Sequence, residues 1–153
     1  MNEAAMDSWG DASEVTTKLI GSWSFDRLIE GQATMQGIAT FTPLDEGSLA
    51  YREQGHLKLQ NGTELAAERE YIFSNSNGGF EVLFKENPPR LFHAISLSAS
   101  MGGELSGRAG HLCNLDDYQS TYTFLADGRI VIRHVVLGPR KDYTMTTTYT
   151  RVG

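Results

Sequence analysis

Eight polar or ionisable side chains fall at alternating positions in segments rich in β-branched and aromatic residues. Alternation counted from Trp23, and from the pattern Tyr51, Glu53, Gly55, turns all eight to the same side of an extended chain. They are Arg27, Glu53, Arg69, Tyr71, His93, His111, Tyr122 and Tyr143. Guanidinium, imidazole and phenol groups donate hydrogen bonds to oxyanions, so these residues form a candidate ligand-binding site.

The charges in this set do not balance, because two arginines and two histidines accompany a single carboxylate, Glu53. A charge that is buried without a partner is costly. Either Glu53 pairs with Arg27 or Arg69 and the polar groups satisfy one another, or the positive surplus receives a carboxylate, phosphate or other anionic head group. Both interpretations stay open, and the second makes an anionic or amphipathic small molecule the expected partner.

An enzyme is the alternative. Glu53 beside His93 or His111 could transfer a proton to or from a small substrate, because two groups of differing pKa in a secluded cavity are sufficient. The sequence has no Gly-x-Ser-x-Gly elbow, no phosphate loop ending in Gly-Lys-Ser/Thr and no His-Glu-x-x-His. Catalytic residues therefore stay unassigned.

A metal site would need donors at characteristic spacings. His111 and Cys113 lie two residues apart on one side of their segment, and His93 could supply a third donor. Structural zinc sites usually show two such close pairs, whereas only one occurs in this chain. We therefore predict no metal and no cofactor.

The elements that position these residues are strands, because Gly, Asn, Asp and Pro cluster at nine places between them. The clusters fall at residues 30–31, 45–47, 60–62, 75–79, 87–89, 101–103, 114–117, 127–128 and 138–139. Nine turns imply about ten strands, and no intervening segment is long enough for a crossover helix. The prediction is all-β and antiparallel. An open sheet of this size would expose two edges, so we expect a closed up-and-down barrel.

The only predicted helix is short, from Ser13 as N-cap to Ile20 before Gly21. Residues 1–12 show no periodicity, so we expect a segment that is mobile unless it caps the barrel, followed by a single barrel domain over residues 13–153.

Two sets of residues resemble known families. Leu19-Ile20-Gly21-Ser22-Trp23 resembles the helix-then-Gly-x-Trp entrance to the first strand of lipocalin-like (calycin) barrels, and Arg151 resembles the arginine that packs across that tryptophan. In a ten-strand antiparallel barrel, Trp23 and Arg151 lie at the same end and can form a cation–π pair there.

From Leu19 onwards, further motifs resemble an uncharacterised family of small bacterial and fungal lipocalin-like domains. They are Gly37-x-Ala39-x-Phe41, Tyr51-x-Glu53-x-Gly55, Arg69-x-Tyr71, Phe92-His93, His111-x-Cys113, Asp116-x-Tyr118 and Gly138-Pro139-Arg140-Lys141-Asp142-Tyr143. This resemblance implies the lipocalin-like fold and no established reaction.

Some intracellular lipocalin-like barrels hold haem through a histidine, which makes haem binding a minor alternative. The candidate ligands are His56, His93, His111 and His134, and none lies in a motif that identifies an axial ligand. His134 is expected to face outward if Val131, Arg133 and Val135 face inward.

Composition restricts the partners. Thirteen Lys and Arg against nineteen Asp and Glu give a net charge of −6, which disfavours nucleic acid. No apolar run approaches the roughly 20 residues that cross a bilayer. One cysteine and an acidic start without a signal-peptide pattern favour a cytoplasmic protein. We expect no nucleic-acid or membrane partner and leave a homodimer open.

The turns opposite Trp23 are the richer in charged and stiff residues, so a ligand should enter there.

Overall fold

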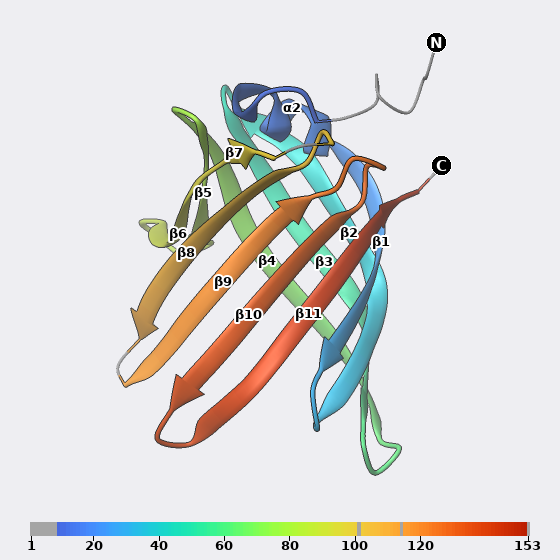
Figure 1. The fold of residues 1–153 in the computed structure, drawn as a ribbon. Helices are drawn as coiled ribbons and strands as arrows, with labels where there is room; N and C mark the ends of the chain where they lie inside the picture. The colour runs from blue at the N-terminus through green and yellow to red at the C-terminus, as the bar shows by residue number, and fades with distance from the viewer. Residues whose placement is uncertain (1–8, 101, 114, 153) are drawn as a thin grey trace.

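The structure, a computed structural model, describes residues 9–100, 102–113 and 115–152 (Figure 1). A 3-10 turn, η1 (Ala12–Glu14), leads into the short helix α2 (Val15–Leu19). The strands are β1 (Gly21–Ile29), β2 (Ala33–Asp45), β3 (Ser48–Leu59), β4 (Glu64–Ser76), β5 (Gly79–Phe84), β6 (Arg90–Ser96), β7 (Ser98–Ala99), β8 (Leu105–Cys113), β9 (Asp116–Phe124), β10 (Ile130–Gly138) and β11 (Lys141–Arg151).

All strand pairs are antiparallel, and the hydrogen-bonded order runs β6, β5, β4, β3, β2, β1, β11, β10, β9, β8, β7. The two ends of this order meet where β6 contacts β8, so the sheet is a nearly closed up-and-down barrel. Gly107 permits this contact, because a Cβ at that position would lie 2.5 Å from the carbonyl oxygen of Ser96. The predicted fold class is confirmed.

The barrel has eleven strands and not ten because one predicted strand is broken at Leu97. Up to Ser96 the chain pairs with β5, and the amide of Leu97 then donates to the carbonyl of Gly78. Ser98 and Ala99 pair instead with β8. This change of partner joins the two ends of the sheet near residue 97.

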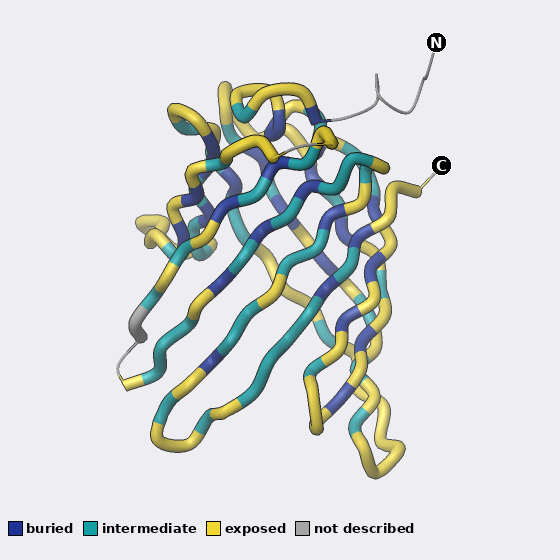
Figure 2. Tube along the Cα trace, viewed as in Figure 1, coloured by how far each residue is buried: buried dark blue, intermediate teal, exposed yellow. Residues whose placement is uncertain are grey.

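Alternation along the strands places the core inside the barrel (Figure 2). In β1, Trp23, Phe25 and Arg27 are buried and the residues between them are exposed, as predicted. In β10 the expected register was wrong: Ile130 and Val136 are buried on the side that also carries His134, and Arg133 is exposed. Both faces of β10 carry β-branched residues, so hydrophobicity alone did not distinguish them.

The helix lies across one end of the barrel, at the top of Figure 1. Its N-cap differs from the prediction, because Asp11 and not Ser13 caps η1: the Asp11 carboxylate accepts a hydrogen bond from the amide of Ser13 at 3.0 Å. Thr16 of α2 donates to the side-chain oxygen of Asn75 on β4 at 3.1 Å. This end of the barrel is therefore tied to the helix.

Two tryptophans fill the same end. Trp9 is buried and stacks on Trp23 with ring centroids 6.0 Å apart, so the packed chain begins before residue 13. The Arg151 guanidinium lies 4.2 Å from the centroid of a Trp23 ring, which confirms the predicted cation–π pair. Residues 1–8 of the predicted mobile segment lie outside the described residues.

Candidate ligand-binding site

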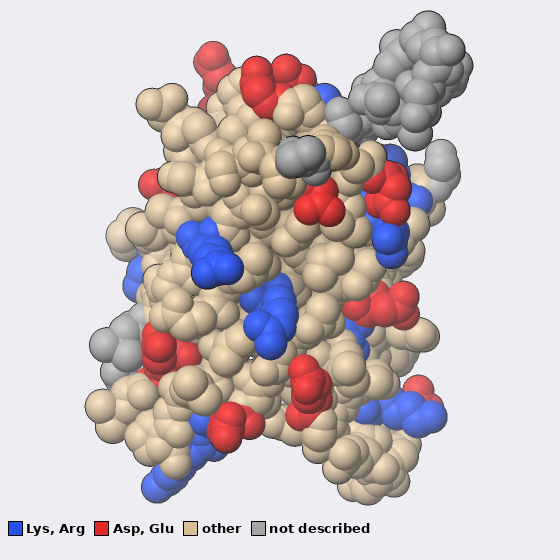
Figure 3. Space-filling view, viewed as in Figure 1, with Lys and Arg blue, Asp and Glu red and all other residues tan. Residues whose placement is uncertain are grey.

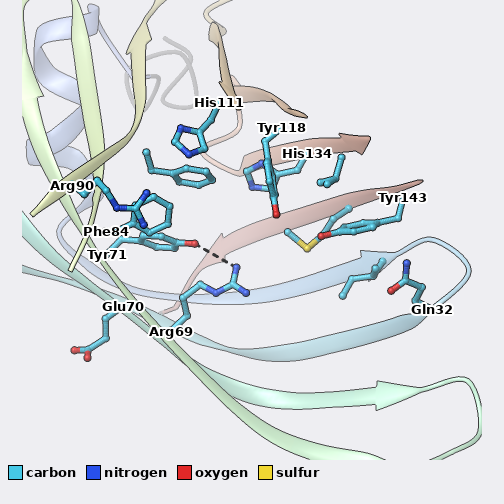
Figure 4. Close-up of a pocket in the computed structure, with 14 residues that line it drawn as sticks. Gln32, Arg69, Glu70, Tyr71, Phe84, Arg90, His111, Tyr118, His134 and Tyr143 are labelled. Carbon is cyan, nitrogen blue, oxygen red and sulfur yellow. Dashed lines mark hydrogen bonds between the residues drawn. The ribbon is translucent and has the colours of Figure 1, made fainter. Parts of the chain in front are cut away.

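A cavity of about 560 Å³ opens at the end of the barrel opposite α2. Most of its lining residues lie near the strand ends next to the β1–β2, β5–β6, β8–β9 and β10–β11 connections, where the sequence led us to expect the entrance. The lining is mainly aromatic and aliphatic, with a few polar groups (Figure 4). It comprises Ile29, Gln32, Arg69, Glu70, Tyr71, Phe84, Arg90, Phe92, His111, Tyr118, His134, Val136, Tyr143 and Met145.

A β-bulge in β6 aims two aromatic rings inward. Val82 pairs with His93 and the next residue, Leu83, pairs with Leu91, so Phe92 has no partner across the ladder. The rings of Phe92 and His93 consequently stack with centroids 3.7 Å apart, instead of pointing to opposite faces of the sheet. Phe92 also packs edge-on against His111 of β8 at 5.3 Å. The bulge therefore builds the cavity wall beside the seam between β6 and β8.

A smaller polar chamber of about 40 Å³ lies next to the cavity and shares five lining residues with it: Arg69, Tyr71, Phe92, His134 and Met145. Here Arg27 and Glu53 form a bidentate ion pair, with N–O distances of 2.7 and 2.9 Å. The Arg27 Nε donates to Thr147 at 2.8 Å, and the Tyr51 hydroxyl donates to Glu53 at 2.6 Å. The chamber is therefore largely self-satisfied.

The ion pair stays charged. Burial disfavours both charges, but the hydrogen bonds and charge of Glu53 raise the pKa of Arg27, and those of Arg27 hold the pKa of Glu53 below its ordinary value. Both Glu53 oxygens have partners, and this carboxylate does not line the outer cavity. The geometry thus gives no support to Glu53 as a proton acceptor beside His93 or His111.

His93 and Tyr122 form a buried pair behind the cavity wall. The His93 Nδ1 lies 2.9 Å from the Tyr122 hydroxyl, and its Nε2 has no hydrogen-bond partner among the described residues. Burial, with smaller contributions from His134 and His111, lowers the pKa of His93 to about 3. His93 is therefore neutral at physiological pH, and its charge does not add to a positive surplus.

His134 lines both the cavity and the chamber, and its Nδ1 hydrogen-bonds with Ser120. Burial, with Arg27 and Arg69, lowers its pKa to about 4. Like His93, it is a neutral imidazole at physiological pH.

Arg69 lines the cavity from an exposed position of β4. Its Nη1 donates to the Tyr71 hydroxyl at the long distance of 3.5 Å, and no ion pair of Arg69 is found in the described part of the chain. Glu70 points away from the cavity centre (Figure 4) and pairs with Lys85 at 3.0 Å. Arg90, at the rim, pairs with Glu86 at 3.1 Å and lies over the Phe84 ring.

The eight predicted residues thus separate into three groups. Arg69, Tyr71, His111 and Tyr143 line the outer cavity; Arg27, Glu53 and Tyr122, with Arg69 and Tyr71 again, line the inner chamber; and His93 lies behind both. Their role in ligand binding stays a prediction.

The sequence reasoning missed several lining residues, among them Phe84, Arg90, Tyr118 and His134. Tyr118 carried a usable signal, because it lies two residues from Ser120 and four from Tyr122 on the inner side of β9.

No cluster of three or more His, Cys, Asp or Glu side chains suited to a metal ion occurs among the described residues. The side chain of Cys113, one of the three donors considered, lies outside that description.

In the described ranges, no helix is long and apolar enough to span a membrane. On the face shown in Figure 3, acidic and basic side chains are interspersed.

Solved structures share the fold at low sequence identity. The S-type phycobiliprotein lyase CPES from Guillardia theta has a TM-score of 0.66 and 8% identity, and the match covers 100% of this chain and 99% of that one. The barrel EF1p2_mFAP2b, solved bound to DFHBI, has a TM-score of 0.52 and 14% identity, covering 92% and 99%. At these identities the likeness shows the fold alone. No curated protein matches the sequence.

The sequence itself matches one family model, over residues 19–151 and therefore over nearly the whole chain. This range begins at Leu19, where the motifs of the lipocalin-like resemblance begin, and ends at Arg151 of the cation–π pair. The chain belongs to the family of unknown function DUF6314.

Proposed function

We propose that the protein binds a small amphipathic molecule, with the apolar part of the ligand in the aromatic cavity and an anionic group at Arg69. One observation carries the proposal: a guanidinium lies in a cavity of about 560 Å³, and no carboxylate in the described ranges forms an ion pair with it. The volume is within the range of about 300–1,000 Å³ that is typical of small-molecule sites.

The charge count supports a single negative charge on the ligand. Glu53 neutralises Arg27 and His93 is neutral, so of the expected two arginines and two histidines only Arg69 and His111 are left to face the ligand, and Arg69 is the arginine that has no ion pair among the described residues. Arginine binds carboxylates and similar groups through charge-assisted hydrogen bonds. The similarly folded barrel EF1p2_mFAP2b is bound to DFHBI, so a barrel of this fold can hold a small molecule.

A pair of naphthalene dyes tests the proposal. 1-Anilinonaphthalene-8-sulfonate carries one negative charge, and N-phenyl-1-naphthylamine is its neutral counterpart. We expect both dyes to bind the native protein, as measured by fluorescence titration. Arg69→Gln should weaken the sulfonate about tenfold, the effect of one charged hydrogen bond, and leave the neutral dye unchanged.

Arg133→Gln is the matched control, because Arg133 is exposed on the outer side of β10. This variant should bind both dyes as the parent protein does. Failure of both dyes to bind, or equal losses for Arg69→Gln and Arg133→Gln, would contradict the proposal.

A further inference from the structure

Two tyrosines from strands that are not neighbours in the sheet direct their hydroxyl groups into the cavity. Tyr71 comes from β4 and Tyr118 from β9, and both hydroxyls point towards the middle of the space near Arg69 (Figure 4). The Tyr143 hydroxyl points into the same region. Phenol groups from separate walls therefore converge on one place.

The hydrogen bonds of Tyr71 and Tyr118 have the same polarity. The Tyr71 oxygen accepts from Arg69 Nη1 at 3.5 Å, and the Tyr118 oxygen accepts from Lys141 Nζ at 3.0 Å. Because each oxygen accepts from a cation, each hydroxyl hydrogen is left to donate elsewhere. No acceptor for either hydrogen is found among the residues that the structure describes.

The motif Gly138-Pro139-Arg140-Lys141-Asp142-Tyr143, which carried the family resemblance, builds the Tyr118 side of this arrangement. Lys141 is held by Asp116, with an N–O distance of 3.2 Å. Asp116 occupies the space beside Gly138, where a Cβ would lie 2.0 Å from its carboxylate oxygen. The hydrogen bond to Tyr118, followed by Asp116, raises the pKa of Lys141 above its ordinary value, so the ammonium stays charged.

A phenol that accepts a hydrogen bond from a cation is a stronger donor, because the bond draws electron density from its oxygen. Burial raises the pKa of Tyr71, so this phenol keeps its proton at physiological pH. The converging phenol groups are thus hydrogen-bond donors. A group that only accepts hydrogen bonds would supply the partner that they lack among the described residues.

We propose that Tyr71, backed by Arg69, and Tyr118, backed by Lys141, hold the oxyanion of the ligand between them. This inference rests on the proposed function and narrows the ligand to a singly charged oxygen acid, either a carboxylate or a phenolate, attached to an apolar body. The charged group lies at the centre of the cavity, and the apolar body packs against Phe84, Phe92 and Met145.

The experiment uses 7-hydroxycoumarin, whose phenol and phenolate forms have different excitation spectra. The site should prefer the phenolate, so the pKa of the bound probe should fall by about one unit, equivalent to a tenfold preference. Tyr71→Phe and Tyr118→Phe, which keep the rings, should each abolish most of this shift and change the affinity for the neutral form little. Lys141→Met should reduce the shift less, because the phenol remains.

The carboxylate arm uses 2-naphthoate and its neutral match 2-naphthamide as competitors of the bound coumarin. Tyr118→Phe should weaken the naphthoate several-fold and the amide little. Thermal melting of each variant verifies that it is folded, and Arg133→Gln should leave all values unchanged.

If the coumarin binds but Tyr71→Phe and Tyr118→Phe leave its pKa shift intact, the oxyanion site is wrong and cavity binding still stands. If neither the coumarin nor the neutral naphthalene dye binds, the proposed function itself fails. A shift present for the coumarin alone assigns the site to phenolates, and selective loss of naphthoate alone assigns it to carboxylates.

Discussion

At the closed end of the barrel the polar atoms of aromatic and charged side chains bind one another and the backbone, whereas at the open end several polar atoms have no partner among the described residues. The Trp23 and Trp9 indoles donate to the carbonyls of Leu19 and Leu125, each at 3.0 Å, and Arg151 donates to the carbonyl of Ile20 at 3.1 Å. Across the barrel, Arg69 has no ion pair among the described residues, and the Tyr71 and Tyr118 hydrogens have no acceptor there.

This difference separates stability from recognition. Polar groups that are satisfied within the chain contribute to folding, and groups held in place without a partner add little to it but remain available to a ligand. The Arg27–Glu53 pair lies between the two ends and is fully engaged, so it belongs with the stabilising region although its residues resemble a binding site.

The largest expected effect is a loss of stability from a substitution at the closed end. Trp23→Ala removes a buried indole together with its stacking on Trp9 and its contact with Arg151, and should lower the free energy of unfolding by about 3–5 kcal/mol. Urea denaturation measures this loss. Tyr143→Ala, a half-buried aromatic truncation at the open end, is the comparison and should cost clearly less. Equal losses would show that the two ends do not differ in stability.

A smaller effect concerns the two imidazoles of low pKa, His93 behind the cavity and His134 in its wall. The pKa values of His93 and His134 lie at about 3 and about 4, below the unfolded value of about 6.5. Between these limits the unfolded chain binds more protons, so the stability present above pH 6.5 is lost as the pH falls. From pH 7 to pH 5 each histidine should account for a loss on the order of 2 kcal/mol.

His134→Gln tests this attribution. The variant should show a shallower fall of unfolding free energy between pH 7 and pH 5 than the parent protein. His56→Gln, at an exposed position of β3, should keep the parent slope. An unchanged slope in His134→Gln would mean that the acid sensitivity arises elsewhere.

The smallest expected effect is the change in stability caused by a substitution at the open end. Arg69→Gln should change the free energy of unfolding by no more than about 0.5 kcal/mol, because the side chain is exposed and has no ion pair in the described structure. The same denaturation assay measures it. A loss of several kcal/mol would identify Arg69 as part of the stabilising network and remove the contrast between the two ends.

Much of the scaffold could be predicted because local signals determine it. Turn residues mark the strand ends, and alternation from Trp23 correctly turns Phe25 and Arg27 inward. The pairing of Trp23 with Arg151 follows from the antiparallel order of the strands.

The remainder depends on events that alternation does not encode. A bulge brings Phe92 and His93 to the same side, and a change of pairing partner at Leu97 creates an eleventh strand. Valines on the outer face of β10 hid the inward position of His134. The partner of Glu53 was left open, because Arg27 and Arg69 both face it and only side-chain geometry decides for Arg27.

The stacked indoles at the closed end also give the protein an intrinsic fluorescence probe. Trp9 and Trp23 are the only tryptophans in the sequence, and neither lines the cavity. Tryptophan fluorescence therefore reports whether the closed end is folded, and the fluorescence of a dye bound in the cavity reports ligand binding. Both signals can be measured in one sample.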